Sequence, residues 1–209
     1  MKTTTAVNFL SESDYLAGER DGQTRHELIG GQAFAMTGAS DKHNKICGNL
    51  FAELRNALKQ KNSPCTAYVN DMKVKVQHDF YYPDIMVVCD FKDKDKENDY
   101  YKTRPIVIVD VLSPSTRRID KTLKRQAYQS LESMQTYVLV EQDQAEIEVF
   151  SRQNAWRSDY FYLGDKIAFQ AVEVEVAVED IYYQIETEDV LAYLVAERKS
   201  INLIYINKL

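Results

Sequence analysis

Two short apolar runs in the middle of the chain constrain the fold more than any other feature. They are Ile85–Cys89, which follows Pro83-Asp84, and Ile106–Leu112, which precedes Ser113-Pro114. Runs of this length, rich in valine and isoleucine, are typical of strands that are covered on both faces of a sheet. Such a sheet needs helices or further strands packed on each side. The two runs therefore predict the centre of a layered α/β protein.

The remaining segments supply the outer parts of such a fold. Apolar residues at helical spacing predict an amphipathic helix from Ser40 or Asp41 to about Lys59. A second helix is expected after Thr116, with an apolar stripe made of Ile119, Leu123, Ala127 and Leu131. Period-two patterns and turn residues predict strands within residues 26–36, 65–77, 136–141, 146–151, 156–163 and 171–178. Shorter helical patterns lie at residues 8–19 and 189–198, and the absence of repeats or linkers predicts a single domain, residues 1–209.

Composition limits the classes of function. The chain has 26 Lys+Arg against 32 Asp+Glu, so a nucleic-acid role would need a local basic patch or a bound cation. Three cysteines, Cys47, Cys65 and Cys89, form no CxxC pair, which indicates a reducing cytoplasm rather than a disulfide scaffold. The apolar runs are too short to cross a bilayer of roughly 30 Å, and the N-terminus lacks the pattern of a secretion signal. We therefore expect a cytoplasmic protein with no membrane span.

A carboxylate interrupts the second apolar run. Asp110 lies in the middle of a predicted buried strand, where an unpaired carboxylate costs several kcal/mol, so it needs a cationic partner, a proton or a metal ion. Asp84 opens the preceding apolar strand, and the two carboxylates would converge if these strands are neighbours. Two ionised carboxylates about 4 Å apart repel by roughly 4 kcal/mol at an effective dielectric of about 20, and a divalent cation would reverse that penalty. Oxygen ligands favour Mg²⁺ or Mn²⁺ over zinc. The alternatives are an ion pair of Asp110 with an arginine or a lysine, for example Arg117 or Arg118, and a capping role for Asp84.

Short motifs at the ends of the predicted strands resemble a known family. They are Glu27-Leu28-Ile29-Gly30-Gly31 with His43 downstream, Tyr82-Pro83-Asp84-Ile85, and Val109-Asp110-Val111-Leu112-Ser113-Pro114-Ser115-Thr116 followed by Asp120, Lys124 and Tyr128. This combination resembles the Uma-two family, a branch of the PD-(D/E)xK superfamily of restriction-endonuclease-like proteins. The resemblance covers about residues 20–150 and leaves residues 151–209 as a strand-rich extension.

The resemblance implies a mixed β-sheet flanked by helices and metal-dependent hydrolysis of DNA. Asp84 and Asp110 would hold the Mg²⁺ or Mn²⁺ ion, and Glu27 would be a third acid, unless it is an ordinary hairpin charge. The superfamily usually places a lysine two residues after the second acid, where this chain has Leu112. Family members also more commonly carry glutamate at the position of Asp110. Both departures leave the source of a catalytic lysine open.

Lys124 is the best replacement for that lysine. Asp120, Lys124 and Tyr128 recur at i, i+4 and i+8, so they share one stripe of the predicted helix. The same spacing also suits a simple surface ion pair between Asp120 and Lys124. Lys73 and Lys75, on the strand before Asp84, are second choices.

A basic cluster begins where the second apolar strand ends. It comprises Arg117, Arg118, Lys121, Lys124 and Arg125, and it is either a solvated helix face or the place where a phosphate backbone is held. Ser113 could hydrogen-bond a phosphate there. The three histidines are far apart in sequence, which disfavours a zinc site and leaves His43 on a helix surface or behind the metal ligands.

Two functions fit these features. The first is an endonuclease acting on DNA, with Glu27, Asp84, Asp110 and Lys124 as catalytic groups. The second is a non-catalytic nucleic-acid-binding or assembly protein on the same fold, in which the missing lysine and the shorter acid mark lost activity. Because cutting both strands needs two sites related by two-fold symmetry, we also expect a homodimer. The edge strand at Val172–Val176 is a candidate for pairing with a second copy.

Overall fold

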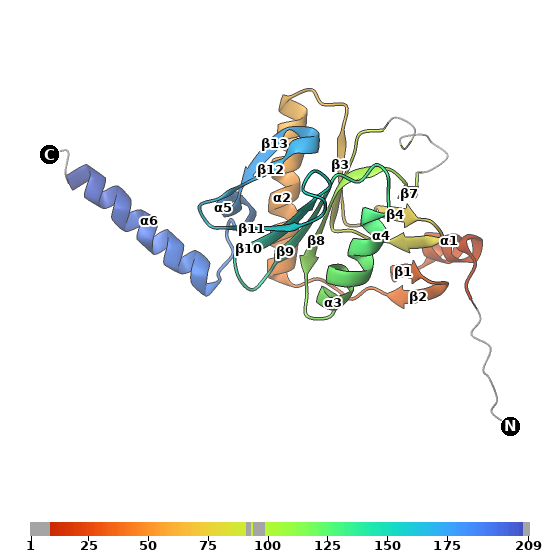
Figure 1. Cartoon of the computed structure of the whole chain (residues 1–209). Coiled ribbons are helices and arrows are strands. Elements are labelled where there is room, and N and C mark those ends of the chain that lie inside the picture. Colours follow the sequence, from red (N-terminus) through yellow and green to blue (C-terminus); the bar gives the residue numbers. More distant parts are fainter. Residues whose placement is uncertain (1–8, 91–92, 94–98, 207–209) are drawn as a thin grey trace.

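A six-stranded mixed sheet forms the centre of the molecule in the computed structural model, which describes residues 9–90, 93 and 99–206 (Figure 1). Strands β8 and β9 are parallel, and the other neighbours in this sheet are antiparallel. The strand order is β11 (Ser158–Tyr162), β10 (Glu146–Ser151), β9 (Thr136–Glu141), β8 (Pro105–Leu112), β6 (Ile85–Val88) and β3 (Thr66–Val69). The two apolar runs, β6 and β8, are therefore neighbours near the middle of the sheet. This arrangement confirms the predicted mixed sheet.

One face of this sheet is covered by the long helix α2 (Asp41–Gln60) and by a small hairpin. The hydroxyl of Ser40 accepts a hydrogen bond from the amide of His43 at 3.1 Å, which caps the helix. Leucines and an isoleucine on the inner side of α2 are buried against valines of β6 and β8. The hairpin β12 (Lys166–Phe169) and β13 (Val174–Ala177), with the short helix α5 (Val178–Ile181), completes this core. The predicted amphipathic helix is confirmed.

The opposite face carries a second helical segment whose buried side differs from the prediction. It consists of α3 (Arg117–Ile119), the π-helical turn η3 (Asp120–Lys124) and α4 (Arg125–Gln129). The expected apolar stripe is wrong at its start, because Ile119 is 39% and Leu123 41% exposed, while Asp120, Lys124 and Tyr128 are buried. The physical reason is Asp110, which lies on the sheet beneath this helix and is compensated by the ammonium group of Lys124.

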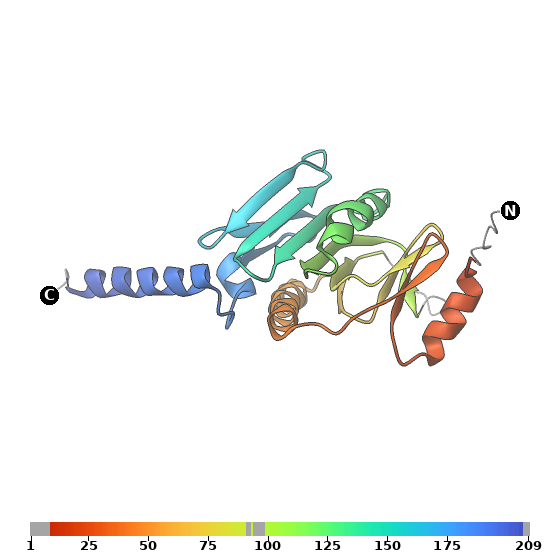
Figure 2. The same cartoon turned by 90° about the horizontal axis from the view of Figure 1, so that it is seen from below.

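A five-stranded sheet packs beside the first one. Its order is β2 (Gln32–Ala35), β1 (His26–Ile29), β5 (Asp79–Tyr81), β4 (Lys73–Val76) and β7 (Tyr101–Lys102). The predicted turn between β1 and β2 is confirmed, since Gly30 and Gly31 both have positive φ. The single strand expected at residues 65–77 is instead two strands in two sheets, separated at Asn70, which has a φ of 58°. Helix α1 (Glu12–Asp21) covers this sheet through Tyr15 (Figure 2).

The C-terminal part differs from the prediction in length and burial. Helix α6 (Glu188–Ile206) continues past the expected end at Arg198 and projects away from the sheets (Figures 1 and 2). The segment at Val172–Val176 is a short 3₁₀ turn, η4 (Gln170–Val172), followed by β13, and its valines are buried in the core beside α2. β13 pairs with β12 and with no other strand of the described residues. Pairing of this edge with a second copy stays a prediction.

The cysteines contradict the expectation that they are unpaired. Cys65 precedes β3 and Cys89 follows β6, and the antiparallel register Thr66↔Val88 places the two cysteines opposite each other. They form a disulfide, whereas Cys47 on α2 is a buried free thiol. The pairing depends on strand register between distant segments, which cysteine spacing does not reveal. No helix among the described residues is long and apolar enough to cross a membrane.

Candidate active site

Asp84 and Asp110 lie at the same end of the β6–β8 pair. Ile85 on β6 is opposite Val109 on β8, so the residues that flank these partners are adjacent. The Asp84 amide donates to Oδ1 of Asp110 at 3.4 Å, and the Val111 amide donates to Oδ2 of Asp84 at 2.7 Å. Each aspartate is therefore held by the backbone of the strand that carries the other.

Lys124 reaches this end of the sheet from the helix above. Its Nζ lies 2.9 Å from Oε1 of Glu27 on β1 and 3.2 Å from Oδ1 of Asp120 one turn earlier. All three side chains are buried, and the amide of Tyr82 donates to the same Glu27 oxygen at 2.9 Å. Burial acts to lower the pKa of Lys124, but the carboxylates of Asp110, Glu27 and Asp120 hold it well above the usual lysine value. The ammonium group therefore stays charged in the interior.

Asp110 is the most perturbed acid of this group. Burial raises the pKa of its carboxyl group, the charge of Lys124 lowers it, and the neighbouring acids Asp120 and Asp84 raise it again. The hydroxyl of Tyr137 donates to Oδ2 of Asp110 at 2.7 Å, which partly offsets these effects. The net pKa lies above the ordinary range of an aspartate. Additional positive charge beside Asp110 would therefore stabilise its ionised form. We call Glu27, Asp84, Asp110, Asp120 and Lys124 the acid–lysine cluster.

A second set of side chains contacts Asp84 from helix α2. Nε2 of His43 lies 3.2 Å from Oδ2 of Asp84, and Nδ1 of the same ring lies 3.5 Å from Sγ of Cys47. Burial acts to lower the pKa of His43, but the hydrogen bond to Asp84 and the charge of its carboxylate together raise it by more, so the net shift is upward. His43 therefore lies largely buried against Asp84 and not on the open surface of the helix. The i, i+4 spacing of His43 and Cys47 was the signal that could have linked these two side chains.

The donor atoms can be tested against two kinds of metal ion. Asp84 and Asp110 offer carboxylate oxygens, the ligands that hard cations such as Mg²⁺ and Mn²⁺ prefer. His43, Cys47 and Asp84 also bring three ligand atoms within 4.8 Å of one another, a nitrogen, sulfur and oxygen set that suits softer metals. Burial raises the pKa of the Cys47 thiol well above its usual value, which disfavours the thiolate that such a metal needs. Asp84 belongs to both sets, so it is the side chain that either kind of ion would contact.

The other basic residues lie around the cluster rather than in it. Arg117 pairs with Glu141, Lys121 lies 3.4 Å from Glu141 and 3.5 Å from Glu148, and the Arg125 guanidinium lies 4.9 Å from the centre of the Phe150 ring. Arg118 is exposed and has no ion pair among the described residues. Arg117 and Arg118 are therefore not the partners of Asp110, because Glu141 binds Arg117 and Arg118 has no ion pair among the described residues. The lysine that the same alternative allowed is Lys124, whose charge lowers the pKa of Asp110.

The remaining candidates lie near or outside this region. The hydroxyl of Ser113 is 2.9 Å from that of Ser115 and 3.0 Å from that of Thr116, within the turn that starts α3. Neither second-choice lysine contacts the two aspartates: Lys75 pairs with Glu12 on α1, and Lys73 donates to the hydroxyl of Tyr82 at 3.2 Å. Lys124 is thus the candidate lysine that the structure brings to the acids.

Two tyrosines of the site were not identified from the sequence as contacts of the acids. Tyr137 on β9 lies beneath the helix and donates to Asp110, and its oxygen also lies 3.2 Å from the carbonyl of Asp120. Tyr128 is fully buried, with its ring centre 5.3 Å from that of Tyr137, and its hydroxyl has no hydrogen bond to the described residues. Burial raises the pKa of Tyr128, and the charges of Asp110 and Glu27 add to the rise. Both phenols stay protonated beside the carboxylates.

The mixed sheet with its flanking helices places the molecule in the class of restriction-endonuclease-like proteins. A family model described as "Putative restriction endonuclease" (Uma2) matches residues 12–179, so the chain belongs to the Uma2 family. The predicted family and fold class are therefore confirmed, and the function of the family is nuclease-like. Family membership leaves open which side chains act on a substrate.

Individual relatives agree with this assignment. The chain is 29% identical over 177 residues to one uncharacterized protein of Synechocystis, covering 83% of this chain and 91% of that protein. It is 28% identical over 144 residues to a second uncharacterized Synechocystis protein, covering 68% and 80%. Among solved structures, "a putative nuclease belonging to DUF820" from Anabaena variabilis has the same fold, with a TM-score of 0.71 at 14% identity, covering 85% of this chain and 99% of that one.

Proposed function

We propose that this protein is a divalent-metal-dependent endonuclease that hydrolyses phosphodiester bonds in DNA. The observation that carries the proposal is the acid–lysine cluster, in which a buried ammonium group lies within 3.2 Å of two carboxylates beside Asp110. Such an arrangement costs free energy to bury and perturbs several pKa values, as groups at catalytic sites often do. The nuclease-like family supports the same reaction class.

Asp84 and Asp110 are the proposed ligands of Mg²⁺ or Mn²⁺. When bound there, the ion supplies positive charge to the phosphate and lowers the pKa of a water molecule. His43 and the Val111 amide both contact Oδ2 of Asp84, so they fix the orientation of its carboxylate. Tyr137 does the same for Asp110 through its hydroxyl.

Lys124 takes the role of the lysine that the superfamily usually carries on the strand. The usual position is occupied by Leu112, which is buried in the apolar cluster together with Tyr128 and Tyr137. Lys124 approaches the same face of the sheet from η3, and Glu27 and Asp120 hold its Nζ in place. A π-helical turn at this point is consistent with a functional constraint, because such turns are frequent at functional sites. The ammonium group would stabilise negative charge that develops on the phosphate.

The proposed path of the DNA backbone follows the outer side of α3 and η3. Arg118 is exposed there, and Arg117, Lys121 and Arg125 lie beside it, with the turn at Ser113 nearest to the strand end. Glu141 and Glu148, which now pair with Arg117 and Lys121, would exchange these partners for phosphates.

The proposal includes a homodimer, since cutting both DNA strands needs two sites, and a cytoplasmic location, where the DNA substrate is found. The strands β3 and β6 pair through four residues besides the Cys65–Cys89 bond, so reduction of this bond leaves their hydrogen-bonded register in place.

The test is plasmid nicking by the purified protein with Mg²⁺ or Mn²⁺. Asp84→Asn and Asp110→Asn keep side-chain size but remove the ligand charge, so each should reduce nicking by roughly a hundredfold or more. Asp143→Asn, at an exposed acid, is the matched control and should leave the rate unchanged. Nicking that survives both site substitutions in folded protein would exclude this site assignment.

A binding or assembly protein on the same fold is the second candidate. It is favoured by Leu112 at the usual lysine position and by the shorter acid Asp110. This alternative predicts no nicking and no saturable binding of Mn²⁺ that depends on Asp84 and Asp110. Calorimetric titration with Mn²⁺ separates the two candidates, because only the enzyme requires such binding.

A further inference from the structure

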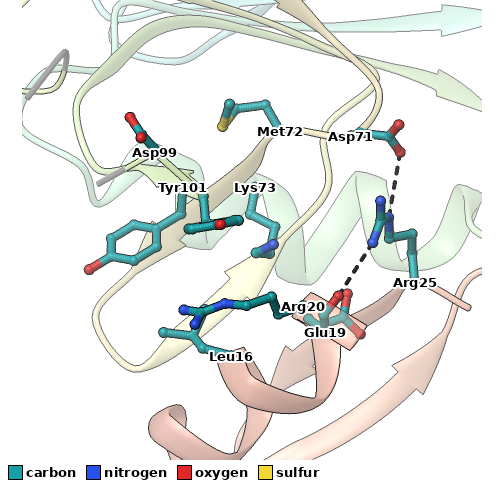
Figure 3. Close-up of a pocket in the computed structure, with 10 residues that line it drawn as sticks. Leu16, Glu19, Arg20, Arg25, Asp71, Met72, Lys73, Asp99 and Tyr101 are labelled. Atoms are coloured by element: carbon teal, nitrogen blue, oxygen red, sulfur yellow. Dashed lines mark hydrogen bonds and ion pairs between the residues drawn. The ribbon is translucent and has the colours of Figure 1, made fainter. Parts of the chain in front are cut away.

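A cavity of about 350 Å³ lies between α1, β4 and β7, apart from the acid–lysine cluster (Figure 3). Its volume falls within the range of about 300–1,000 Å³ that is usual for small-molecule sites. Figure 3 shows Lys73 pointing from β4 toward α1, and Arg25 joined by dashed lines to Asp71 and Glu19. The nuclease proposal uses none of these side chains.

Lys73 is the unusual group of this cavity. It is 6% exposed, and its ammonium group donates one hydrogen bond, to the hydroxyl of Tyr82 at 3.2 Å. No carboxylate of the described residues lies within ion-pair distance of its Nζ. Burial lowers the pKa of Lys73, and Glu19 counteracts this only in part. A buried ammonium group with three donors and one acceptor is stabilised when an anion enters the cavity.

Of the three acids that line the cavity, Glu19 and Asp71 are already engaged, whereas Asp99 has no ion pair among the described residues. Glu19 accepts hydrogen bonds from the amide of His26 at 3.0 Å and from the hydroxyl of Tyr82 at 2.7 Å. Asp71 lies 3.7 Å from Nε of Arg25, and both side chains are exposed, so this ion pair is weak and can exchange. Arg25 also donates to the Glu19 carbonyl at 3.4 Å. An incoming anion would thus find Lys73 and Arg25 available.

The mouth of the cavity offers a flat aromatic surface. Tyr100 is 55% exposed, and the guanidinium carbon of Arg20 lies 5.0 Å from the centre of its ring. Tyr101 beside it is fixed edge-on against Phe80, with ring centres 5.3 Å apart. Nucleobases stack on exposed aromatic rings and on arginine guanidinium groups. A buried cation next to such a surface therefore matches a ligand with a phosphate and a base.

We propose that this cavity binds a nucleoside monophosphate unit, with the phosphate on Lys73 and Arg25 and the base against Tyr100 and Arg20. The unit is either a free nucleotide or one nucleotide of a nucleic-acid chain. Tyr82 connects the cavity to the acid–lysine cluster, because its hydroxyl contacts Lys73 while its amide donates to Glu27 at 2.9 Å. The binding site does not require the nuclease proposal to hold.

The test is calorimetric titration of the intact protein in EDTA with dAMP, with adenosine and with a 5′-phosphorylated dinucleotide. The wild type should bind at least one phosphorylated compound saturably and bind adenosine at least about tenfold more weakly, because a charged hydrogen bond is lost. Tighter binding of dAMP identifies a free nucleotide as the ligand, and tighter binding of the dinucleotide identifies a chain nucleotide. Absence of saturable binding, or equal binding of adenosine, overturns the proposal.

Variants locate the binding. Lys73→Met should weaken binding of the phosphorylated compound at least about tenfold, and Tyr100→Ala, at an exposed side chain that cannot unfold the core, should weaken it several-fold. Lys45→Met, which removes an exposed lysine of α2, is the control and should bind as the wild type does. Wild-type affinity in both cavity variants overturns the proposal. Because EDTA excludes metal-dependent cleavage, these results do not depend on nicking activity.

Discussion

Lys124 and Lys73 have the same small exposed fraction, but Lys124 lies deeper in the protein and the surroundings of the two ammonium groups are opposite. Each is 6% exposed. Lys124 lies within 3.2 Å of Glu27 and Asp120, and the surrounding carboxylates raise its pKa. Lys73 has a phenol hydroxyl as its hydrogen-bond partner, and burial lowers its pKa. A low exposed fraction therefore does not by itself tell whether a charged group is already compensated by the protein or would be compensated by a ligand.

Replacement of Lys124 should have the largest effect on stability. Lys124→Met would leave Glu27, Asp110 and Asp120 without their cation, so we expect the free energy of unfolding to fall by about 3–5 kcal/mol. Lys73→Met leaves no unpaired carboxylate, so the corresponding change should stay within about 1 kcal/mol of zero or be stabilising. Urea denaturation of both variants measures the two values. Equal losses would show that the two lysines are compensated alike.

The positions of Asp84, Asp110 and Lys124 could be predicted from the sequence, whereas the cavity at Lys73 could not. An aspartate inside an apolar run and a second aspartate at the start of the neighbouring run are local features, and so is the i, i+4, i+8 stripe that contains Lys124. Lys73 lies in a strand that the period-two pattern at residues 65–77 predicts, but that pattern does not predict its burial. It is buried because α1, some fifty residues earlier in the chain, covers that face of β4.

The errors at the helix and at the cysteines have the same origin. Ile119 and Leu123 were expected inside because helix periodicity favours apolar burial, but the helix turns its polar stripe toward Asp110. Cys65 and Cys89 were expected free because their spacing fits no motif, but the register of β3 and β6 brings them together. In each case the outcome depends on which segment packs opposite, which periodicity alone does not specify.

A smaller effect tests the connection between the two regions. Tyr82→Phe removes the hydroxyl shared by Lys73 and Glu19 but keeps the backbone amide that binds Glu27. We expect the free energy of unfolding to fall by about 1–3 kcal/mol, because two buried polar groups lose a partner. The affinity for the phosphorylated nucleotide should change, because Lys73 loses its hydrogen-bond partner. The rate of plasmid nicking should stay the same. A loss of nicking in the folded variant would mean that Tyr82 acts on both regions through its hydroxyl.

The two lysines should also differ, by a smaller amount, in how their contributions to the free energy of unfolding vary with pH. The folded-state pKa of Lys73 lies below the ordinary lysine value of 10.5, so in alkaline solution the native state releases this proton before the unfolded chain does. The contribution of Lys73 to the free energy of unfolding should therefore rise as pH increases toward 10.5. The folded-state pKa of Lys124 lies above 10.5, so its contribution is fully present below that value and is lost only at higher pH.

Urea denaturation between about pH 8 and about pH 10 measures both trends, provided that each variant is compared with the wild type at the same pH. The difference between wild type and Lys73→Met should move in favour of the wild type as pH rises, whereas the difference between wild type and Lys124→Met should stay constant. Parallel curves for the two variants would contradict the opposite shifts. If a bound nucleotide flattens the Lys73 trend, an anion is keeping that lysine protonated, which directly connects the titration to the proposed ligand.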